Sequence, residues 1–372
     1  MPTLDHGSNV HHNVFGRQTP SASSEAGLTG MASLRLRVNE WVEVRSLEEI
    51  VGTLDANGCL DGLPFMPEMV QYCGKRFRVY KSAHKTCDTI NQYVIRRMDK
   101  TVHLEGLRCD GQSHGGCQAG CLLFWKEAWL KRAQPPIRSG LEEAAPRPVG
   151  STLTGTGPAC EMLQRATRVP DEAGGEERYR CQATELLKAT SSVRRRDQWD
   201  PRFYWRDLTS GNVALRDFVR YGLLAIVNAF MLRWRGRRYP HVCGLAGKRT
   251  PTAELNLRSG DLIRVRSRRE IMNTLNAQLR NRGLWFDVEM VPHCGSEKRV
   301  LRRVEQIVDE KTGRLIRLPH ACLILDGVTC SGNLSTYRMF CPRAVYPYWR
   351  EIWLDRVEDP LAAPGSHAAD SD

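Results

Sequence analysis

The chain of 372 residues contains one sequence pattern twice, and this internal repeat restricts its fold more than any other feature. The stretch from Trp41 to Arg132 recurs, diverged but in register, between Leu262 and Val357. At one constant separation, the matched residues are Val44 and Val265, Ser46 and Ser267, Gly62 and Gly283, Glu68 and Glu289, and Cys73 and Cys294. After a small length difference, the matched residues are Cys117 and Cys341, Trp125 and Trp349, Glu127 and Glu351, and Trp129 and Trp353. The repeat predicts two modules that share one fold.

Short strands are the elements that the pattern within each copy favours. Residues 41–45 and 262–266 alternate apolar and polar side chains, as a half-buried strand does. Ser46 and Ser267 can cap short helices, which we expect at 47–54 and 268–275. Further strands are predicted at 76–81, 102–108, 298–303 and 321–325. The predicted fold class is mainly β, with some helix (α+β).

The start of the second copy resembles a known type of small barrel. Ser259-Gly260-Asp261 leads into the alternating residues 262–265, and this arrangement is similar to the first strand of SH3-like and KOW-type β-barrels. In those folds a Gly-Asp turn precedes an alternating strand. The resemblance implies a small SH3-like barrel for each module, and it implies no ligand and no activity.

Composition divides the chain into segments. Residues 1–33 and 359–372 are rich in small and polar side chains without periodic apolar positions, so we expect disordered tails. Residues 134–177 contain several prolines and glycines and predict a flexible linker. The remaining segments are module 1 (34–133), a helical connector (178–258) and module 2 (259–358).

Each module closes with two tryptophans four residues apart. Trp125 and Trp129 in module 1 match Trp349 and Trp353 in module 2, and the spacing is that of one helix face. Paired aromatic residues of this kind usually fill a core. We therefore expect all four side chains to pack inside the barrels and not to bind a ligand.

The connector contains one long amphipathic segment. Asn212 is a suitable N-cap for a helix over 213–235, in which apolar residues recur at helical spacing. Four arginines, Arg233, Arg235, Arg237 and Arg238, follow at its end. One interpretation is a strut that docks one barrel on the other, with its C-terminal cations stabilised by the helix dipole. The other is a helix that binds a polyanion or a membrane surface.

The chain is basic. It has 54 lysines and arginines against 42 acidic residues, a net charge of +12. Such an excess is typical of proteins with an anionic partner, such as a nucleic acid, an anionic membrane surface or a phosphorylated substrate. The arginines at 233, 235, 237 and 238 are the predicted phosphate contacts, and a protein partner is the alternative.

The sequence predicts a cytoplasmic location. The N-terminal residues lack the charged, apolar and small-residue order of a signal peptide. The longest apolar run, 221–232, falls short of the roughly 18 residues that a transmembrane helix needs. In a reducing compartment, the 13 cysteines are expected to be metal ligands or buried thiols before disulfides.

A glycine-rich loop of module 1 carries the densest set of possible metal ligands. Cys109, His114, Cys117 and Cys121 lie within 13 positions of one another in the sequence Cys-Asp-Gly-Gln-Ser-His-Gly-Gly-Cys-Gln-Ala-Gly-Cys. Thiolate and imidazole groups are the ligands that zinc prefers, and glycines allow the tight turns that bring them to one centre. The loop therefore predicts a metal site.

Three thiols are matched between the copies. Cys73, Cys109 and Cys117 correspond to Cys294, Cys330 and Cys341, which predicts a three-thiolate set in each module. The fourth ligand differs between the modules and stays open at this point. The candidates are His114, Cys121 and Cys87 in module 1, and His293, His320 and Cys322 in module 2.

Two zinc ions per chain, one in each module, are the predicted cofactors, because cysteine-rich tetrahedral sites are usually structural zinc sites. An iron–sulfur cluster is the alternative, since Cys109-x4-His114-x2-Cys117 has plant-type ferredoxin spacing with one cysteine replaced by histidine. A third interpretation is buried thiols without metal.

The predicted function is a metal-stabilised, tandem-module binding or scaffold protein with a nucleic acid or another polyanion as partner. The alternative is a biosynthetic or tailoring enzyme with a metal, a cluster or a reactive thiol between the modules. No catalytic residue can be named, because the sequence lacks the phosphate-binding, nucleophile-elbow and metalloprotease motifs.

Overall fold

The computed structural model describes residues 33–91, 95–135, 157–169, 177–194, 200–335, 338 and 340–358. The tails predicted at 1–33 and 359–372 lie outside these ranges apart from Ser33, as does much of the predicted linker.

Module 1 is built on a five-stranded antiparallel sheet in the order β8-β7-β4-β1-β9. The strands are β1 (Trp41–Val44), β4 (Arg76–Ser82), β7 (Thr101–Arg108), β8 (Leu122–Lys126) and β9 (Leu130–Arg132). The shorter elements are α1 (Leu47–Val51), β2 (Cys59–Leu60), β3 (Leu63–Pro64), η1 (Pro67–Tyr72), β5 (Lys85–Cys87), β6 (Ile95–Arg97), η2 (Gln112–His114) and η3 (Glu127–Trp129). A second, small sheet joins β5 and β6 to β12 (Ser191–Ser192) of the connector.

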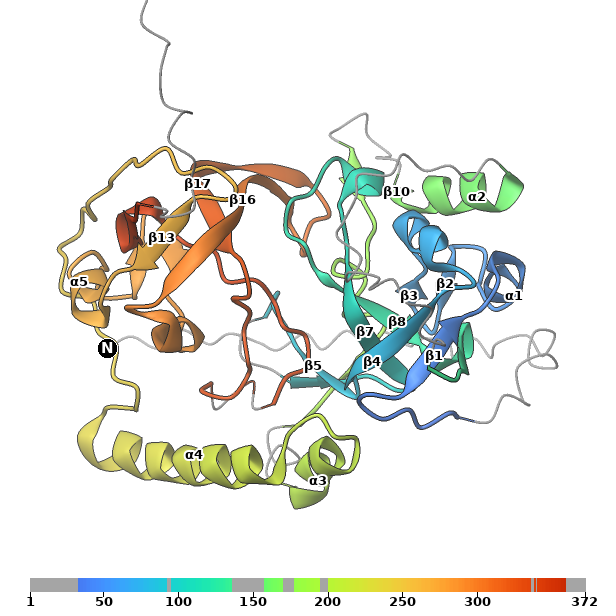
Figure 1. Ribbon diagram of the computed structural model, residues 1–372, viewed down its shortest axis with the longest axis horizontal. Helices are drawn as coiled ribbons and strands as arrows, with labels where there is room; N and C mark the ends of the chain where they lie inside the picture. Colours follow the sequence, from blue (N-terminus) through green and yellow to red (C-terminus); the bar gives the residue numbers. More distant parts are fainter. Residues whose placement is uncertain are drawn as a thin grey trace, which may run out of the picture. The chain divides into compact units, whose positions relative to one another are not determined.

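Module 2 is built on a four-stranded antiparallel sheet in the order β17-β16-β13-β18. The strands are β13 (Leu262–Val265), β16 (Glu297–Val308), β17 (Leu315–Leu325) and β18 (Leu354–Arg356). The shorter elements are α5 (Arg268–Met272), β14 (Arg280–Asn281), β15 (Leu284–Trp285), η5 (Val288–His293) and η6 (Glu351–Trp353). Both main sheets curl as half-barrels (Figure 1), so the predicted mainly β (α+β) fold with two β modules is confirmed.

The first strand of each module leads into a capped helix, as the sequence predicts. Ser46 and Ser267 each accept a hydrogen bond from the backbone N–H three residues on, and the carboxylates of Glu49 and Glu270 accept one from the N–H of the cap residue. These capping boxes satisfy amide groups that a helix start leaves without partners. Both helices end earlier than expected, at Val51 and Met272.

The four predicted core tryptophans are fully buried. Phe65 lies edge-on to Trp125 and Trp129, with ring centroids 6.2 and 5.2 Å apart, and Phe286 repeats this arrangement with Trp349 and Trp353 at 6.3 and 5.4 Å. The prediction of a core role is confirmed. The prediction that the two tryptophans of a module lie on one helix face is wrong, because Trp125 lies in β8 and Trp129 in the short η3 turn.

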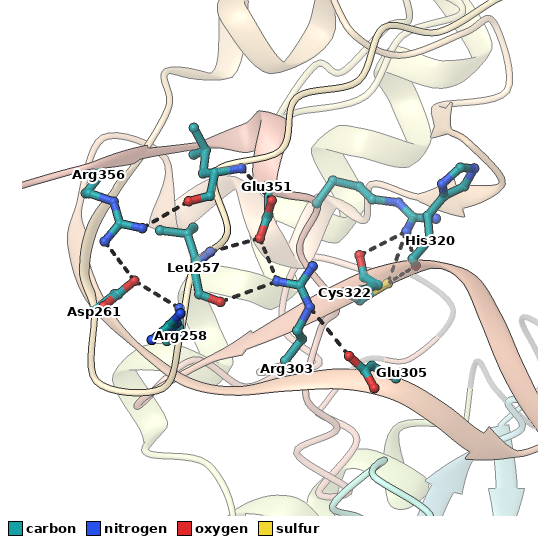
Figure 2. Close-up of polar contacts among 12 residues, drawn as sticks. Leu257, Arg258, Asp261, Arg303, Glu305, His320, Cys322, Glu351 and Arg356 are labelled. Atoms are coloured by element: carbon teal, nitrogen blue, oxygen red, sulfur yellow. Dashed lines mark hydrogen bonds and ion pairs between the residues drawn. The ribbon is translucent and has the colours of Figure 1, made fainter. Parts of the chain in front are cut away.

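A buried carboxylate fixes the segment that enters each barrel. Glu351 accepts hydrogen bonds from the N–H groups of Leu255 and Leu257 and from Arg303, at 2.6, 3.1 and 2.7 Å (Figure 2). Its sequence match Glu127 accepts from the N–H group of Leu36 at 3.3 Å. The matched glutamate therefore binds the backbone of the segment before the first strand in both modules.

Part of the predicted linker forms regular structure. The helix α2 (Pro158–Ala166) is followed by β10 (Arg168–Val169), which pairs with β11 (Arg178–Tyr179). Pro158 at the first position favours helix initiation, and Leu163 is fully buried in the core of module 1. This difference from the expected linker arises because tertiary burial stabilises a helix that composition alone disfavours.

The connector is helical at α3 (Pro201–Thr209) and α4 (Leu215–Arg235). The prediction that Asn212 caps α4 is wrong, because the helix begins at Leu215 and Ala214 is at the N-cap position. Its side chain instead accepts from the N–H group of Ser82 at 2.7 Å and donates to the carbonyl of Ser82 at 2.8 Å. These two bonds attach the connector to the C-terminal end of β4.

The apolar residues of α4 are largely exposed, which differs from the expected docked strut. Leu223, Ile226 and Phe230 are each more than half exposed, and Asn228 is the buried residue of the helix. Figure 1 shows α4 as one uninterrupted helix. Within the described ranges, no helix is both long enough and apolar enough to cross a bilayer.

Candidate metal centre

The cysteine loop of module 1 begins where β7 ends and closes where β8 begins. The Cys109 N–H donates to the carbonyl of Cys121 at 2.8 Å, and Gly116 donates to Gly111 at 2.9 Å. Gly111 has a φ of 76°, and a Cβ atom there would lie 1.9 Å from the carbonyl oxygen of Cys117. Only glycine fits such an approach, so the loop geometry depends on this position.

Three possible ligands meet at this loop. The carboxylate of Glu68, the thiol of Cys109 and the imidazole of His114 have donor atoms that all lie within 4.8 Å of one another. The Sγ of Cys109 and the Nε2 of His114 are 3.3 Å apart. Metal–ligand bonds of about 2.0–2.3 Å in a tetrahedron put neighbouring donors roughly 3.5 Å apart, so this separation suits a shared ion.

The buried carboxylate of Glu68 has one oxygen atom without a hydrogen-bond partner among the described residues. Its side chain is 3% exposed, and its Oε2 accepts a hydrogen bond from Ser113. Its Oε1 is buried and has no hydrogen-bond partner among the described residues. A buried polar atom left unsatisfied costs about 1–3 kcal/mol, and more when it is charged. A cation at this point would remove that cost.

The loop encloses a cavity of about 30 Å³. Four thiols line it together with Glu68 and His114, and they belong to Cys109, Cys117, Cys121 and Cys181. The volume is enough for a water molecule or one ion, for which roughly 10–15 Å³ suffices. Cys181 comes from the connector, and Val308 and Glu310 come from module 2, so together with residues 66–68 and 109–123 four segments of the sequence line the cavity.

Burial makes most of these thiols poor acids. It raises the pKa of Cys109 well above the usual range, with a further rise from the Glu68 carboxylate. It raises the pKa of Cys121 to about 11 and that of Cys181 to about 12. Without a cation these three side chains stay protonated, and a bound metal would displace their protons.

Cys117 is the exception among the cavity thiols. Burial would raise its pKa, but hydrogen bonds from His114 and from the N–H groups of Val308 and Ala119 outweigh burial, and the net pKa is lowered. Burial would lower the pKa of His114, but Cys117 and Glu68 reverse this effect and raise it. The His114 ring contacts a thiol through its Nε2, which lies 3.3 Å from the Sγ of Cys109.

The cysteine loop also contacts module 2. The Val308 N–H in β16 donates to the Sγ of Cys117 at 3.3 Å. Cys341, the match of Cys117, makes the reciprocal contact, because its Sγ accepts a hydrogen bond from the Cys87 N–H in β5 at 3.2 Å. Cys341 has a lowered pKa, because hydrogen bonding to Cys87 outweighs burial. Each module thus places its matched cysteine against a strand of the other.

The matched glutamate of module 2 has a different environment. Glu289 accepts hydrogen bonds from Ser331 Oγ at 2.6 Å and from the N–H groups of Leu334 and Ser335 at 2.8 and 2.9 Å. Its carboxylate is therefore saturated by the chain itself. Where module 2 is described, no group of three close ligands like that of module 1 is formed.

Several predicted ligands lie elsewhere. Cys73 and Cys294 cap the ends of η1 and η5, pack against the two cores, and are not among the residues that line the cavity. Cys322 contacts Arg350 at 3.4 Å (Figure 2). His293 lies beside Trp349, with ring centroids 6.4 Å apart, and His320 is exposed. Cys330 is half-buried, and burial raises its pKa above the usual range.

Sequence reasoning missed two residues of the site. Glu68 belongs to the Glu-Met-Val stretch that both copies keep, so the repeat held a signal for it. Cys181 lies outside both copies, and nothing in its surroundings in the sequence indicated the cavity. The ligand set expected from cysteine matching alone thus differs from the donors that the fold brings together.

The predicted polyanion-binding arginines lie at and just beyond the end of α4. Arg233, Arg235 and Arg237 are exposed, whereas Arg238 is half-buried and has an interaction partner. The helix ends in the left-handed residue Gly236, so the last two arginines lie in the segment that leaves the helix.

No family model, curated protein or solved structure matches this chain.

Proposed function

We propose that the chain is a metal-stabilised binding protein of two modules, and that module 1 holds one zinc ion through Glu68, Cys109 and His114. The buried, unpartnered Oε1 of Glu68 beside a thiol and an imidazole is the observation that carries this proposal. Oxygen, nitrogen and sulfur ligands together are typical of zinc.

Cys117 is the fourth ligand in this proposal. Its thiol lines the same cavity and has a lowered pKa, which favours a thiolate. It lies outside the group of three donors that are within 4.8 Å of one another, so the loop would have to close around the ion. Four protein ligands complete a tetrahedral set, as in structural zinc sites. Zinc would then fix the loop whose Cys117 contacts Val308 in module 2. Cys121 and Cys181, which line the same cavity, are the further thiols that an iron–sulfur cluster would need.

Binding is favoured over catalysis in this cavity because of its size. Pockets for organic ligands are usually about 300–1,000 Å³, whereas this cavity has about 30 Å³. The partner is instead expected at the surface. A net charge of +12 and the exposed arginines of the connector support a polyanion.

The zinc proposal is tested by metal analysis of the full chain and of two matched variants. The wild-type protein should contain one zinc per chain and be colourless. Glu68→Gln keeps the shape of the side chain but removes its charge, and it should weaken zinc binding by at least about tenfold, as the loss of a ligand or its close support does. Glu289→Gln, the matched control in module 2, should keep the metal.

Zinc-free protein after purification without chelators would contradict the proposal, as would a Glu68→Gln variant with unchanged zinc affinity. Visible absorbance with stoichiometric iron would establish the iron–sulfur alternative instead.

A further inference from the structure

The α4 helix presents an apolar face to solvent. Along it, large apolar side chains that are 49–73% exposed recur at helical spacing, and they are Leu215, Val219, Leu223, Ile226, Val227, Phe230 and Trp234. At 3.6 residues per turn these positions fall within an arc of roughly 120°. We call them the α4 apolar face. Contiguous exposed apolar surface of this kind usually marks an interaction site.

The opposite side of α4 holds it on the protein. Phe218 stacks on Phe340, with ring centroids 5.4 Å apart and planes at 21°. The buried Asn228 donates to the carbonyl of Tyr239 at 2.7 Å and accepts from its N–H group at 2.8 Å. These contacts fix the orientation of the helix, and so they keep the apolar face turned outward.

Charge identifies the chemistry of the partner. The segment 201–238 contains eight arginines and two aspartates, and one of the two, Asp207, is buried in an ion pair with Lys85. Arg216, Arg220 and Arg233 are exposed on α4 itself. A second copy of the same helix would bring arginines against arginines. The partner must therefore combine an apolar phase with negative charge.

We propose that the α4 apolar face docks on an anionic lipid surface. The helix lies along the membrane plane, its apolar side chains enter the acyl boundary, and its arginines reach the phosphate groups. Trp234 and Trp205, which are 73% and 64% exposed, are of the type enriched at that boundary. The inference rests on the proposed function, in which the partner is a polyanion, and it names that partner.

A nucleic acid fits the same surface less well. Its binding is dominated by contacts between cations and phosphates, and it offers no apolar phase for a row of aliphatic side chains such as Leu223 and Ile226. A lipid surface satisfies the arginines and the apolar face together.

The test is sedimentation of the full-length chain with vesicles. One set contains phosphatidylcholine alone, and the other contains three parts phosphatidylcholine to one part phosphatidylglycerol. Ile226→Asn/Phe230→Asn changes two exposed positions of the apolar face, and Leu245→Asn is the control at an exposed leucine outside α4, where Leu245 is 59% exposed. Zinc content and circular dichroism of each variant report folding.

The wild-type chain should bind the anionic vesicles and should bind phosphatidylcholine weakly. The double variant should lose at least about tenfold in affinity, since two large apolar side chains would no longer enter the acyl boundary, while Leu245→Asn should bind normally. No vesicle binding by a zinc-loaded wild-type chain would overturn the inference and leave the zinc proposal standing. Equal binding to an RNA or DNA oligonucleotide, unaffected by Ile226→Asn/Phe230→Asn, would overturn it in favour of a nucleic acid.

Discussion

Two glutamates at matched positions, Glu68 and Glu289, have different hydrogen-bond partners in the two modules. Glu289 receives hydrogen bonds from three groups of its own loop, whereas Glu68 keeps one buried oxygen without such a partner within the described ranges. The difference follows from the loops, because module 1 carries His114 and module 2 supplies backbone N–H groups instead. The repeat places a glutamate at the same position in both modules, and the loop around it decides which one can bind a cation.

The buried His103 makes the stability of the folded state depend on pH. Burial lowers its pKa to about 3, although its Nδ1 bonds the carbonyl of Leu123 at 2.9 Å. The folded state therefore keeps the ring neutral, while an unfolded chain protonates it near pH 6.5. Stability is lost as the pH falls from about 6.5 towards 3, by at most about 1.4 kcal/mol per pH unit from this group.

We predict that His103→Gln flattens this part of the stability profile. Urea unfolding at pH 7 and pH 5 measures the effect, with the difference between the two pH values smaller in the variant than in the wild-type chain. Equal differences in both proteins would show that His103 does not contribute.

At the scale of elements, the cysteine loop depends on one close backbone approach. We predict that Gly111→Ala loses zinc, because the added Cβ would lie 1.9 Å from the carbonyl oxygen of Cys117. Gly106 is the matched control, since it has a similar φ of 74° and nothing within 4 Å of an added Cβ. Gly106→Ala should cost about 1–2 kcal/mol of backbone strain and keep the metal. Equal zinc loss in both variants would contradict this role of the approach.

Strands and caps could be predicted from the sequence because their signals are local. The alternation at 41–45 and 262–266 and the serine caps at Ser46 and Ser267 need only neighbouring residues. The helix α2 was missed because its stability comes from Leu163 packing on a distant core. The cavity was missed in part because Cys181 reaches it from the connector.

Matching of cysteines also has a physical limit. Cys73 and Cys294 are kept in both copies, yet each packs against its own core. A buried free cysteine behaves as a small apolar residue, so a matched thiol can be conserved between copies for packing alone. Distinguishing a ligand from such a residue requires the three-dimensional distances.

At the scale of the whole molecule, zinc binding and the contact between modules are predicted to be coupled. Cys117 accepts the Val308 N–H, and the carbonyl of Gln306 accepts the N–H of Gln118 at 3.0 Å. Removal of zinc should loosen the loop and speed amide hydrogen exchange at Val308 in β16. Amides of β13, such as that of Val265, are the control within module 2 and should keep their protection. Unchanged exchange at Val308 would show that the metal loop and module 2 are independent.

Zinc should also contribute to the stability of the chain in a concentration-dependent manner. Because the ion binds the folded state, its contribution grows as RT ln(1 + [Zn]/Kd), or about 2.7 kcal/mol at a hundred times Kd. Thermal unfolding at rising free zinc should show the midpoint increase, and Glu68→Gln should shift this increase to zinc concentrations at least about tenfold higher. A midpoint that does not depend on zinc in the wild-type chain would contradict a site that is coupled to folding.

X-ray absorption at the zinc edge of the purified chain tests the central claim most directly. The account predicts a tetrahedral first shell in which sulfur scatterers at about 2.3 Å, from Cys109 and Cys117, are mixed with nitrogen and oxygen scatterers at about 2.0–2.2 Å, from His114 and Glu68. A shell of four sulfur atoms, or a protein that contains no zinc, would contradict it.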